Sequence, residues 1–582
     1  MNRREFLEIL GAASITAQLS GCTSLRTARP DDYYALPAWG DARLLHITDT
    51  HAQLNPIYFR EPSINLGVGA ARGQLPHLVG RNLLDVLTST NPRDVHAFTC
   101  IDFSEAAERY GRVGGFAYVK TLIDTLRGES GALLLDGGDT WQGSGTSLWT
   151  RGRDMVEACN LLGVDVMTGH WEFTYQAQEV LDNADLLSAD FVSQNVRATE
   201  DSLFEGTHVF DEDTGHVFPP YVVKELNGRR IAIIGQSFPY TPIANPQRFI
   251  PDWTFGIRES DLAELVAQVR SRERVDAVVL LSHNGMDVDL KLAGRVPGID
   301  FILGGHTHDG VPVPAVVANP GGRTVVTNAG SNGKFVGVLD IKFGAAGIDG
   351  YRYRLLPVFA NLLEPDPQMQ AHIDRVREPY LQRLEEPLAV TDSLLYRRGN
   401  FNGTFDQVIC DALRQVLDAQ ISLSPGFRWG TSVLPGQTIT MENVMDQTGM
   451  TYPETYVREM RGEEIRVILE SVADNLFNPD PYYQQGGDMV RVGGLRYSCA
   501  PDAPNGERIR NLELTDGTPL QAGAAYKVAG WATVGERSPG PPVWDVVADY
   551  LRDQGTIRID KANEPTLEGV KDDPGIARYD CS

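Results

Sequence analysis

Five short apolar runs, each followed by aspartate or histidine, constrain the fold of this 582-residue chain more than any other feature. The runs are Leu44–Ile47, Ala132–Leu135, Asp165–Met167, Ala277–Leu281 and Phe301–Leu303. Continuous apolar runs of this length are typical of strands that are buried on both faces of a parallel sheet. Ligands bind beyond the carboxyl ends of such strands, so the polar residues after the runs are expected to line one crevice.

The order of apolar runs and helical stretches predicts two folded domains. Strand-like runs alternate with helical stretches over residues 40–360, which predicts an α/β layered domain. A polar helix over 361–388, interrupted by Pro379, is predicted to link this domain to the next. The second domain, α+β, is predicted over 389–582 and begins with a helix around Phe405–Leu417.

The first 22 residues have the polarity order of a twin-arginine export signal. Arg3 and Arg4 precede a modest apolar segment, and this order predicts export to the periplasm. Leu19–Cys22 also resembles a lipoprotein processing site, in which Cys22 would be acylated; an ordinary cleavage site is the alternative. Residues 23–39 are polar without periodicity, which predicts a flexible tether.

Composition narrows the class of function. The formal net charge of −25 repels phosphate backbones and argues against general nucleic-acid binding. No apolar run reaches the roughly 20 residues that a membrane-spanning helix needs. The six cysteines include no Cys-x-x-Cys pair, which argues against a thiolate zinc site. Cys159 and Cys410 fall in helix-like apolar patterns and are predicted to be buried thiols.

The residues that follow the five runs suit a pair of metal ions. Two divalent cations about 3.5–4 Å apart repel each other and need a bridging anion, which one shared carboxylate can supply. Imidazole and carboxylate ligands suit manganese, zinc or iron. Each residue alone also has an ordinary interpretation, as a helix cap or a satisfied polar side chain. Their occurrence after all five runs favours the metal sites, and the seven candidates are Asp49, His51, Asp139, His170, His283, His306 and His308.

These motifs resemble the signature of the calcineurin-like metallophosphoesterases. The matching segments are Asp49-x-His51, Gly138-Asp139, Gly169–Glu172, His283 and Gly305-His306-x-His308. The C-terminal domain resembles that of the 5′-nucleotidases. The resemblance implies a four-layer αββα catalytic domain with a smaller α+β substrate-binding domain. It also implies a first metal site of Asp49, His51, Asp139 and His308, and a second of Asp139, His170, His283 and His306.

One position departs from the phosphoesterase pattern. Trp171 stands where these enzymes carry the histidine that protonates the departing alkoxide. An indole has one N–H donor and cannot deliver a proton at neutral pH. The leaving group therefore needs no acid, or the enzyme is impaired. A sulfur leaving group fits the first case, because thiols have far lower pKa values than alcohols.

The sequence around this departure, together with two later segments, resembles that of the SoxB subfamily of thiosulfohydrolases. Gly169–Tyr175, Ser424–Gly430 and Gln485–Gly494 carry the resemblance. It implies release of sulfate from a cysteine S-thiosulfonate on the carrier protein SoxYZ, by attack of a hydroxide that the metals make available on the terminal sulfone. It also implies a periplasmic location and two divalent cations, usually Mn²⁺.

Several further residues are candidates for substrate contact. Arg428 is expected to stabilise charge on the sulfone oxygens, although a surface arginine is an equal alternative. Trp171 is expected to form a wall of the pocket, or else to pack in the core. The remaining candidates for substrate contact lie in polar or glycine-rich turns, and a structural role is their alternative: Asn400, Asn402 and Arg491.

Two other functions remain open. A periplasmic 5′-nucleotidase would share the fold and the metals, and Phe427 and Trp429 could imitate half of its aromatic clamp for a base. That enzyme, however, is expected to carry the acid histidine that Trp171 replaces. A non-catalytic extracytoplasmic binding protein is expected to have lost ligands, whereas all seven are present.

Overall fold

The computed structural model describes residues 33–570, except 88, 90, 129–130, 208 and 346. The export signal, the candidate acylation site Cys22 and most of the expected tether lie outside the described residues. From Pro37 onward the described chain forms one compact unit. Among the described helices, none combines the length and apolarity that a membrane span requires.

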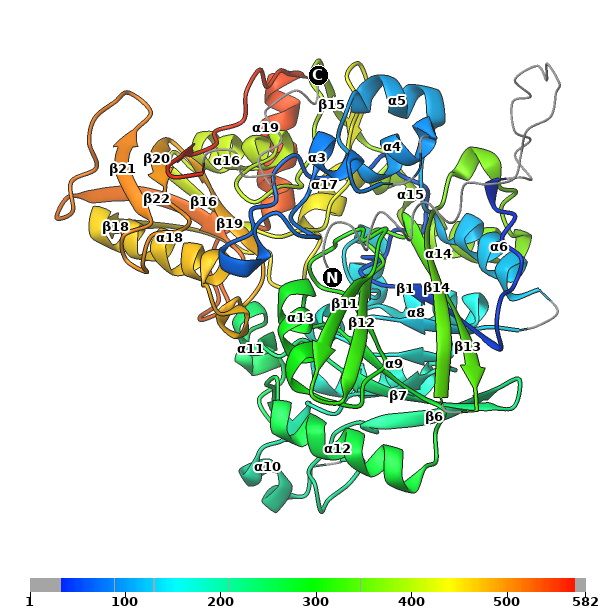
Figure 1. The fold of residues 1–582 in the computed structure, drawn as a ribbon. Helices are drawn as coiled ribbons and strands as arrows, with labels where there is room; N and C mark the ends of the chain where they lie inside the picture. Colours follow the sequence, from blue (N-terminus) through cyan, green and yellow to red (C-terminus); the bar gives the residue numbers. More distant parts are fainter. Residues whose placement is uncertain are drawn as a thin grey trace, which may run out of the picture. The chain divides into compact units, whose positions relative to one another are not determined.

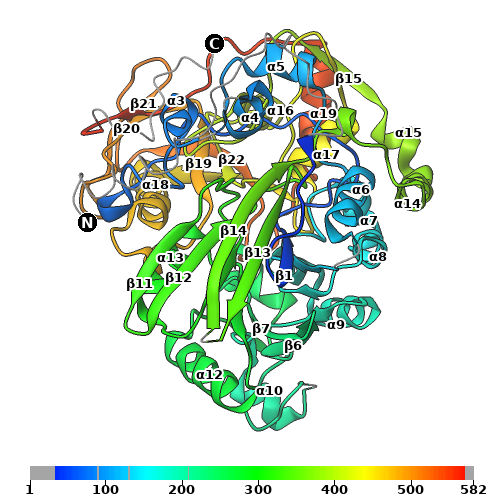
Figure 2. The ribbon, with the colours of Figure 1, turned by 45° about the vertical axis from the view of Figure 1, so that its right-hand side comes forward.

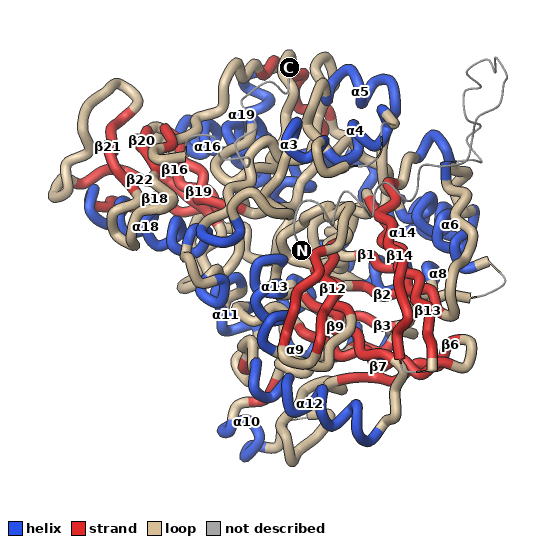
Figure 3. Tube along the Cα trace, in the orientation of Figure 1, coloured by secondary structure: helices blue, strands red, loops and turns tan. Residues whose placement is uncertain are grey.

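Two six-stranded sheets form the N-terminal part of this unit (Figures 1 and 3). The first has the order β14-β13-β1-β2-β3-β4 and consists of β1 (Ala42–Ile47), β2 (Leu133–Asp136), β3 (Val166–Met167), β4 (Asp190–Phe191), β13 (Phe335–Gly344) and β14 (Gly347–Pro357). The second has the order β11-β12-β10-β9-β7-β6 and consists of β6 (Tyr221–Leu226), β7 (Arg229–Gln236), β9 (Ala277–Ser282), β10 (Phe301–Gly304), β11 (Ala315–Asn319) and β12 (Gly322–Asn328).

Apolar side chains from both sheets meet in one core, and helices cover the outer faces. Leu44 and Leu135 of the first sheet share a cluster with Val279 and Phe301 of the second. On the outer face of the second sheet lie α12 (Glu259–Arg272) and α13 (Met286–Arg295). Figure 2 shows α6 (Phe116–Arg127), α8 (Arg153–Leu162) and α9 (Ala177–Leu186) beyond the first sheet. The predicted αββα layering is thus confirmed.

The C-terminal part is built on a four-stranded sheet with helices on both faces. The sheet order is β18-β22-β16-β19, with β16 (Ile421–Gly426), β18 (Thr455–Arg461), β19 (Asp488–Gly493) and β22 (Ala525–Trp531). One face packs on α16 (Thr404–Val416), α17 (Met441–Thr448) and α19 (Val543–Gln554). The other packs on α18 (Gly462–Phe477). The helix that the sequence predicts around Phe405–Leu417 is α16.

The connection between the two parts is not one continuous helix. It consists of α14 (Pro367–Arg377), a 3-10 turn at Glu378–Tyr380 and α15 (Leu381–Leu384). Pro379 lies in the turn, because proline lacks the N–H that a continuing helix needs. Elsewhere, Cys159 and Cys410 are buried free thiols, as predicted.

The topology brings the ends of the predicted strands to one edge. β1, β2 and β3 are parallel neighbours in the first sheet, and β9 and β10 are parallel neighbours in the second. The turn after β1 is joined to the turn after β2, because the backbone amides of Asp49 and His51 donate to the carbonyls of Gly138 and Asp139 at 2.8 Å each. The polar residues after the strands therefore converge.

Candidate metal centre

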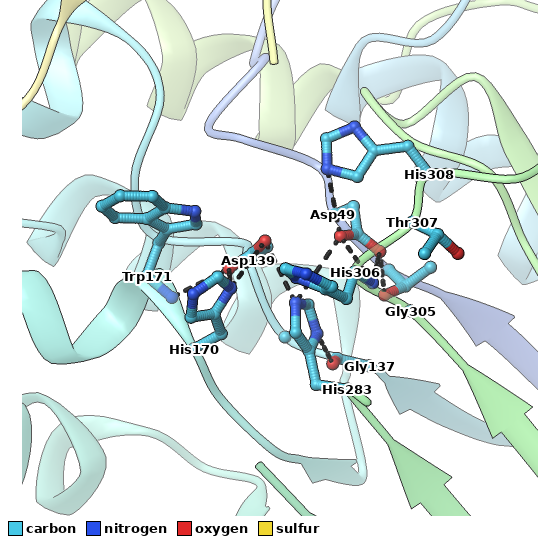
Figure 4. Close-up of polar contacts among 12 residues, drawn as sticks. Asp49, Gly137, Asp139, His170, Trp171, His283, Gly305, His306, Thr307 and His308 are labelled. Atoms are coloured by element: carbon cyan, nitrogen blue, oxygen red, sulfur yellow. Dashed lines mark hydrogen bonds and ion pairs between the residues drawn. The ribbon is translucent and has the colours of Figure 1, made fainter. Parts of the chain in front are cut away.

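Seven side chains from five strand ends form two groups that share Asp139. Figure 4 labels six of them, all but His51. Within each group one potential ligand atom per residue lies within 4.8 Å of the others. All seven side chains are buried. The groups are Asp49, His51, Asp139 and His308, and Asp139, His170, His283 and His306. This is the grouping that the resemblance implied.

Asp139 lies between the groups, where a bridging carboxylate is needed. Its Oδ2 is 3.1 Å from His283 Nε2 and 3.6 Å from His51 Nε2. Its Oδ1 is 3.1 Å from His170 Nδ1 and accepts a hydrogen bond from the backbone amide of Trp171 at 2.8 Å. One carboxylate thus faces ligands of both groups.

Asp49 occupies the far side of the first group. Its Oδ1 lies 3.2 Å from His308 Nε2. The hydroxyl of Thr48 donates to its Oδ2 at 2.6 Å, and the backbone amide of His306 donates to its Oδ1 at 2.9 Å. These donors orient the carboxylate and leave Oδ1 facing the group.

The backbone of the site is strained at its ligands. Asp49, His51, Asp139, His306 and His308 have φ between 47° and 71°, in the left-handed region that non-glycine residues rarely adopt. Such conformations persist only where the surrounding structure holds them, and they cluster at functional sites. Five of the seven side chains therefore owe their direction to turns that stability alone would not favour.

Hydrogen bonds set the tautomers of two histidines. Nδ1 of His283 lies 2.6 Å from the carbonyl oxygen of Gly137, and Nδ1 of His51 lies 3.1 Å from that of Gln142. A carbonyl only accepts, so each Nδ1 carries a proton and each Nε2 faces the cluster, where it presents a lone pair when the ring is neutral. Metal-binding histidines are held in this way.

The donor set fits divalent cations. Buried ring nitrogens of three of the histidines lack a hydrogen-bond partner among the described residues: Nε2 of His170, both nitrogens of His306 and Nδ1 of His308. Buried polar atoms without partners are costly, and a cation would satisfy the nitrogen that each imidazole turns toward its group. Two carboxylates and five imidazoles match the mixed shells of borderline metals.

Burial keeps most of these imidazoles neutral. It lowers the pKa of His51 to about 4 and lowers those of His170, His306 and His308 as well. Burial also acts on His283, but the carboxylates of Asp139 and Asp49 outweigh it and raise the pKa to about 10. A cation between these carboxylates would take the place of that proton.

Glu172 connects the turn that carries Asp139 to the turn that carries His170. Its buried carboxylate accepts hydrogen bonds from four backbone amides. Oε2 accepts from Asp139 at 3.2 Å and from His170 at 2.7 Å, and Oε1 accepts from Thr140 at 2.7 Å and from Trp141 at 3.1 Å. The sequence motif contained Glu172, but its position along the chain alone assigned it no role.

Replacing Glu172 with glutamine is expected to lower metal affinity by roughly 10–100-fold, the range for groups that orient ligands. Either orientation of the amide would point its NH₂ at two backbone N–H groups. Glu470→Gln is the matched control, because Glu470 is buried and also accepts from backbone amides, those of Gly506, Arg508 and Ile509. Titration with Mn²⁺ measures the difference; equal affinities in both variants would contradict this role.

A cavity of about 320 Å³ opens from the cluster toward the C-terminal sheet. Asp139, His170, His306 and His308 line one end. Its aromatic lining includes Trp171, Phe427, Trp429 and Trp531, with Phe238 and Tyr456. Trp171 thus lines the pocket and also packs in the core, and Figure 4 shows its indole N–H directed toward the cluster.

Arg428 also lines this cavity, but most of its guanidinium is used within the protein. Nε donates to Asp488 Oδ1 at 3.3 Å, one terminal nitrogen to the carbonyl of His306 at 3.3 Å and the other to that of Gly487 at 2.8 Å. The side chain thereby holds the glycine turn before β19 against His306. A Cβ on Gly486 would lie 2.0 Å from His306 Nε2, so only glycine fits there.

The other expected substrate contacts do not reach the cavity. Arg491 is fully buried, and its guanidinium donates to Asp406 and Asp488 and to backbone carbonyls. Asn402 donates to Gln407 and to the carbonyl of Asn563. Asn400 accepts from the amide of Leu66 and lines a neighbouring cavity of about 60 Å³. The contacts of Arg491 and Asn402 are those of the structural alternative, whereas the cavity that Asn400 lines is also lined by His306 and Arg428.

Comparison with known proteins gives a consistent family assignment. Residues 389–540 match the family model of the 5′-nucleotidase C-terminal domain. The chain is 25% identical to the 5′-nucleotidase of Bos taurus over 499 residues, which cover 76% of this chain and 81% of that protein. It is 25% identical to the trifunctional nucleotide phosphoesterase YfkN of Bacillus subtilis over 81% of this chain. The chain spans only 33% of the length of YfkN.

Two solved structures resemble the chain over most of its length. The sulfate thiohydrolase SoxB of Thermus thermophilus, in complex with glycerol, superimposes with a TM-score of 0.85 at 37% identity and covers 92% of this chain and 98% of its own. A 5′-nucleotidase precursor from Thermus thermophilus superimposes with a TM-score of 0.71 at 23% identity, over 91% and 99%. The chain therefore carries a 5′-nucleotidase C-terminal domain and belongs to the same family as the SoxB protein of Thermus thermophilus.

Proposed function

We propose that this chain is a dimetal thiosulfohydrolase, which releases sulfate from a cysteine S-thiosulfonate on a SoxYZ-type carrier protein. The observation that carries the proposal is Trp171 at the wall of the metal cavity, where the phosphoesterases hold their general acid. The 37% identity to a sulfate thiohydrolase supports the same reaction. Hydrolysis of the S–S(VI) bond consumes one water and yields a persulfide, sulfate and two protons, so no oxidant is needed.

Among the described histidines and carboxylates that line the cavity, none is a free acid for a leaving group. His170, His306 and His308 belong to the cluster. Asp488 is buried, but Arg428 and Arg491 lower its pKa below the ordinary value, so it stays ionised. A persulfide leaves readily as an anion, whereas an alkoxide benefits from an acid. This cavity therefore suits a sulfur leaving group.

The chain's own residues position the reaction. When bound, two divalent cations supply Lewis acidity, which makes hydroxide available at neutral pH and offsets charge on the sulfonate oxygens. Asp139 and the five imidazoles hold the reacting centre at one end of the cavity. Trp171, Phe427 and Trp429 exclude water around the leaving sulfur, which strengthens electrostatic interactions there.

The cofactor and location complete the proposal. We propose Mn²⁺ as the metal, supported by the mixed nitrogen and oxygen donors. Export to the periplasm is supported by Arg3 and Arg4, and acylation of Cys22 would add a lipid anchor.

A nucleotidase is the second candidate, and the family relatives favour it. Phe427 and Trp429, however, already stack on each other with ring centroids 4.2 Å apart and an interplanar angle of 20°. That separation leaves no space for a base between them. A base could therefore stack only on the outer face of one of these rings and not between them.

Parallel assays test the choice of substrate. With Mn²⁺ bound, we expect sulfate release from a thiosulfonated carrier, and AMP turnover that is lower by roughly 10²-fold or more, because the general acid is absent. Sulfate is measured by ion chromatography and phosphate by a colorimetric assay on the same preparation. Fast AMP turnover without sulfate release would overturn the proposal in favour of the nucleotidase.

A further inference from the structure

The indole N–H of Trp429 is a buried donor without a partner at the metal end of the cavity. The side chain is only 1% exposed, and its Nε1 has no hydrogen-bond partner among the described residues. Trp429 lines the same cavity as Asp139 and His308. A buried donor is normally paired, so an unpaired donor on a ring that lines a ligand cavity suggests that the ligand supplies the acceptor.

The position of this donor is fixed by packing on several sides. The indole stacks on the ring of Phe427, with the ring centroids 4.2 Å apart, and meets Trp171 edge-on at a centroid distance of 5.0 Å. Its centroid lies 5.5 Å from that of the His51 imidazole. A donor that packing holds in place needs no reorganisation when its ligand arrives.

The backbone beside Trp429 is also tied to a ligand turn. The side-chain amide of Asn332 donates to the carbonyl of Gly430 at 3.1 Å. The backbone amide of Asn332 donates to the carbonyl of Asp49 at 2.8 Å. The loop after β16 is thereby connected to the turn that presents Asp49 to the first group.

Comparison with the indole N–H groups of Trp141 and Trp531 shows what distinguishes Trp429. Trp141 is also buried with an unpartnered Nε1, but it does not line the cavity. Trp531 does line it, yet its Nε1 donates to the hydroxyl of Ser424 at 2.8 Å. Among these three indoles, Trp429 alone combines a buried, unpartnered N–H with a place on the cavity wall.

We propose that the N–H of Trp429 donates a hydrogen bond to an oxygen of the tetrahedral oxyanion group held at the metal centre. This proposal rests on the proposed function, in which that group is the terminal sulfonate. An indole N–H is a neutral donor that keeps its proton. It therefore stabilises charge on an oxygen without protonating the leaving sulfur, and Trp429 is a substrate-binding residue.

The first test follows the indole N–H directly in metal-loaded protein. The chain has eight tryptophans, so a ¹⁵N-indole spectrum is small, and Trp429→Phe identifies the signal by its loss. Zn²⁺ replaces Mn²⁺ to avoid paramagnetic broadening. Thiosulfate is expected to shift the Trp429 signal and to leave that of Trp141, identified by Trp141→Phe, in place. A Trp429 signal that shifts with metal alone and ignores every oxyanion would overturn the proposal.

A titration with inorganic phosphate distinguishes failure of the Trp429 proposal from failure of the proposed function. If the chain is a nucleotidase, phosphate shifts the Trp429 signal while the thiosulfonated carrier yields no sulfate, so the donor role stands although the function fails.

Kinetics give a further readout. Trp429→Phe keeps an aromatic ring and is expected to lower kcat/KM about tenfold, the effect of losing one hydrogen bond to a charged group. Trp141→Phe is expected to leave kcat/KM within about twofold; equal losses in both variants would contradict the proposal.

If Trp429→Phe fails to fold, the wild-type protein still tests the proposal. A crystal structure of the wild-type, metal-loaded protein with thiosulfate bound is expected to place an oxygen about 2.7–3.2 Å from Trp429 Nε1. An ordered water at that position, with the oxyanion bound elsewhere, would overturn the proposal.

Discussion

Asp139→Asn is expected to reduce hydrolysis by roughly 10³-fold or more, the scale of losing a main electrostatic element of an active site. Asparagine keeps the shape of the side chain but removes the charge that faces both groups of ligands. Without it, two cations at short separation lack their shared anion, so we also expect at least one metal ion to be lost. Elemental analysis and the rate of sulfate release measure the two effects.

Asp136→Asn is the matched control for this variant. Asp136 lies at the end of the same strand and is equally buried, but it accepts from the amide of Gly138 and the hydroxyl of Thr140 and does not belong to the cluster. Burial raises its pKa well above the ordinary value, so an amide is a close substitute for its protonated form. An Asp139→Asn protein that keeps both metals and its rate would show that the shared carboxylate is not the bridge.

Trp171→His is expected to raise AMP hydrolysis by about 10²-fold, at the lower end of what a general acid contributes. The indole N–H of Trp171 points toward the cluster, so an imidazole on the same backbone would face a leaving alkoxide (Figure 4). The backbone amide would still donate to Asp139. Because the acid form is needed, the gained activity should fall as pH rises through the pKa of the new imidazole.

Trp171→Phe separates proton donation from the change of volume. It removes the N–H and offers no acid, so AMP hydrolysis should stay at the wild-type level or below. Steady-state rates with AMP across pH 5–9 provide the comparison. Equal AMP rates for the histidine and phenylalanine variants, without a pH-dependent difference, would mean that Trp171 does not explain the poor fit to alcohol leaving groups.

The sequence was most informative where strand ends coincide with ligands. Parallel strands bring their carboxyl ends to one edge, so Asp49, Asp139 and His283 could be placed together without coordinates. The strand-end motif likewise located Trp171 at the pocket wall. These predictions follow from local pattern and sheet geometry, which a single chain displays.

Contacts between residues that are far apart in the sequence could not be predicted from that pattern. The carbonyls of Gly137 and Gln142, which set the histidine tautomers, are backbone atoms whose direction no side-chain motif reveals. Arg491 follows a glycine-rich turn, which suggested a substrate contact, yet it lies in β19 and its guanidinium donates to Asp406, 85 residues away. Asn332 joins two loops that only the folded chain brings together.

Anomalous diffraction from crystals of the Mn²⁺-loaded wild-type protein tests the dimetal centre most directly. We expect two peaks, one among Asp49, His51, Asp139 and His308 and the other among Asp139, His170, His283 and His306, with Asp139 in contact with both. A single peak, or peaks away from these side chains, would contradict a dimetal centre at this site.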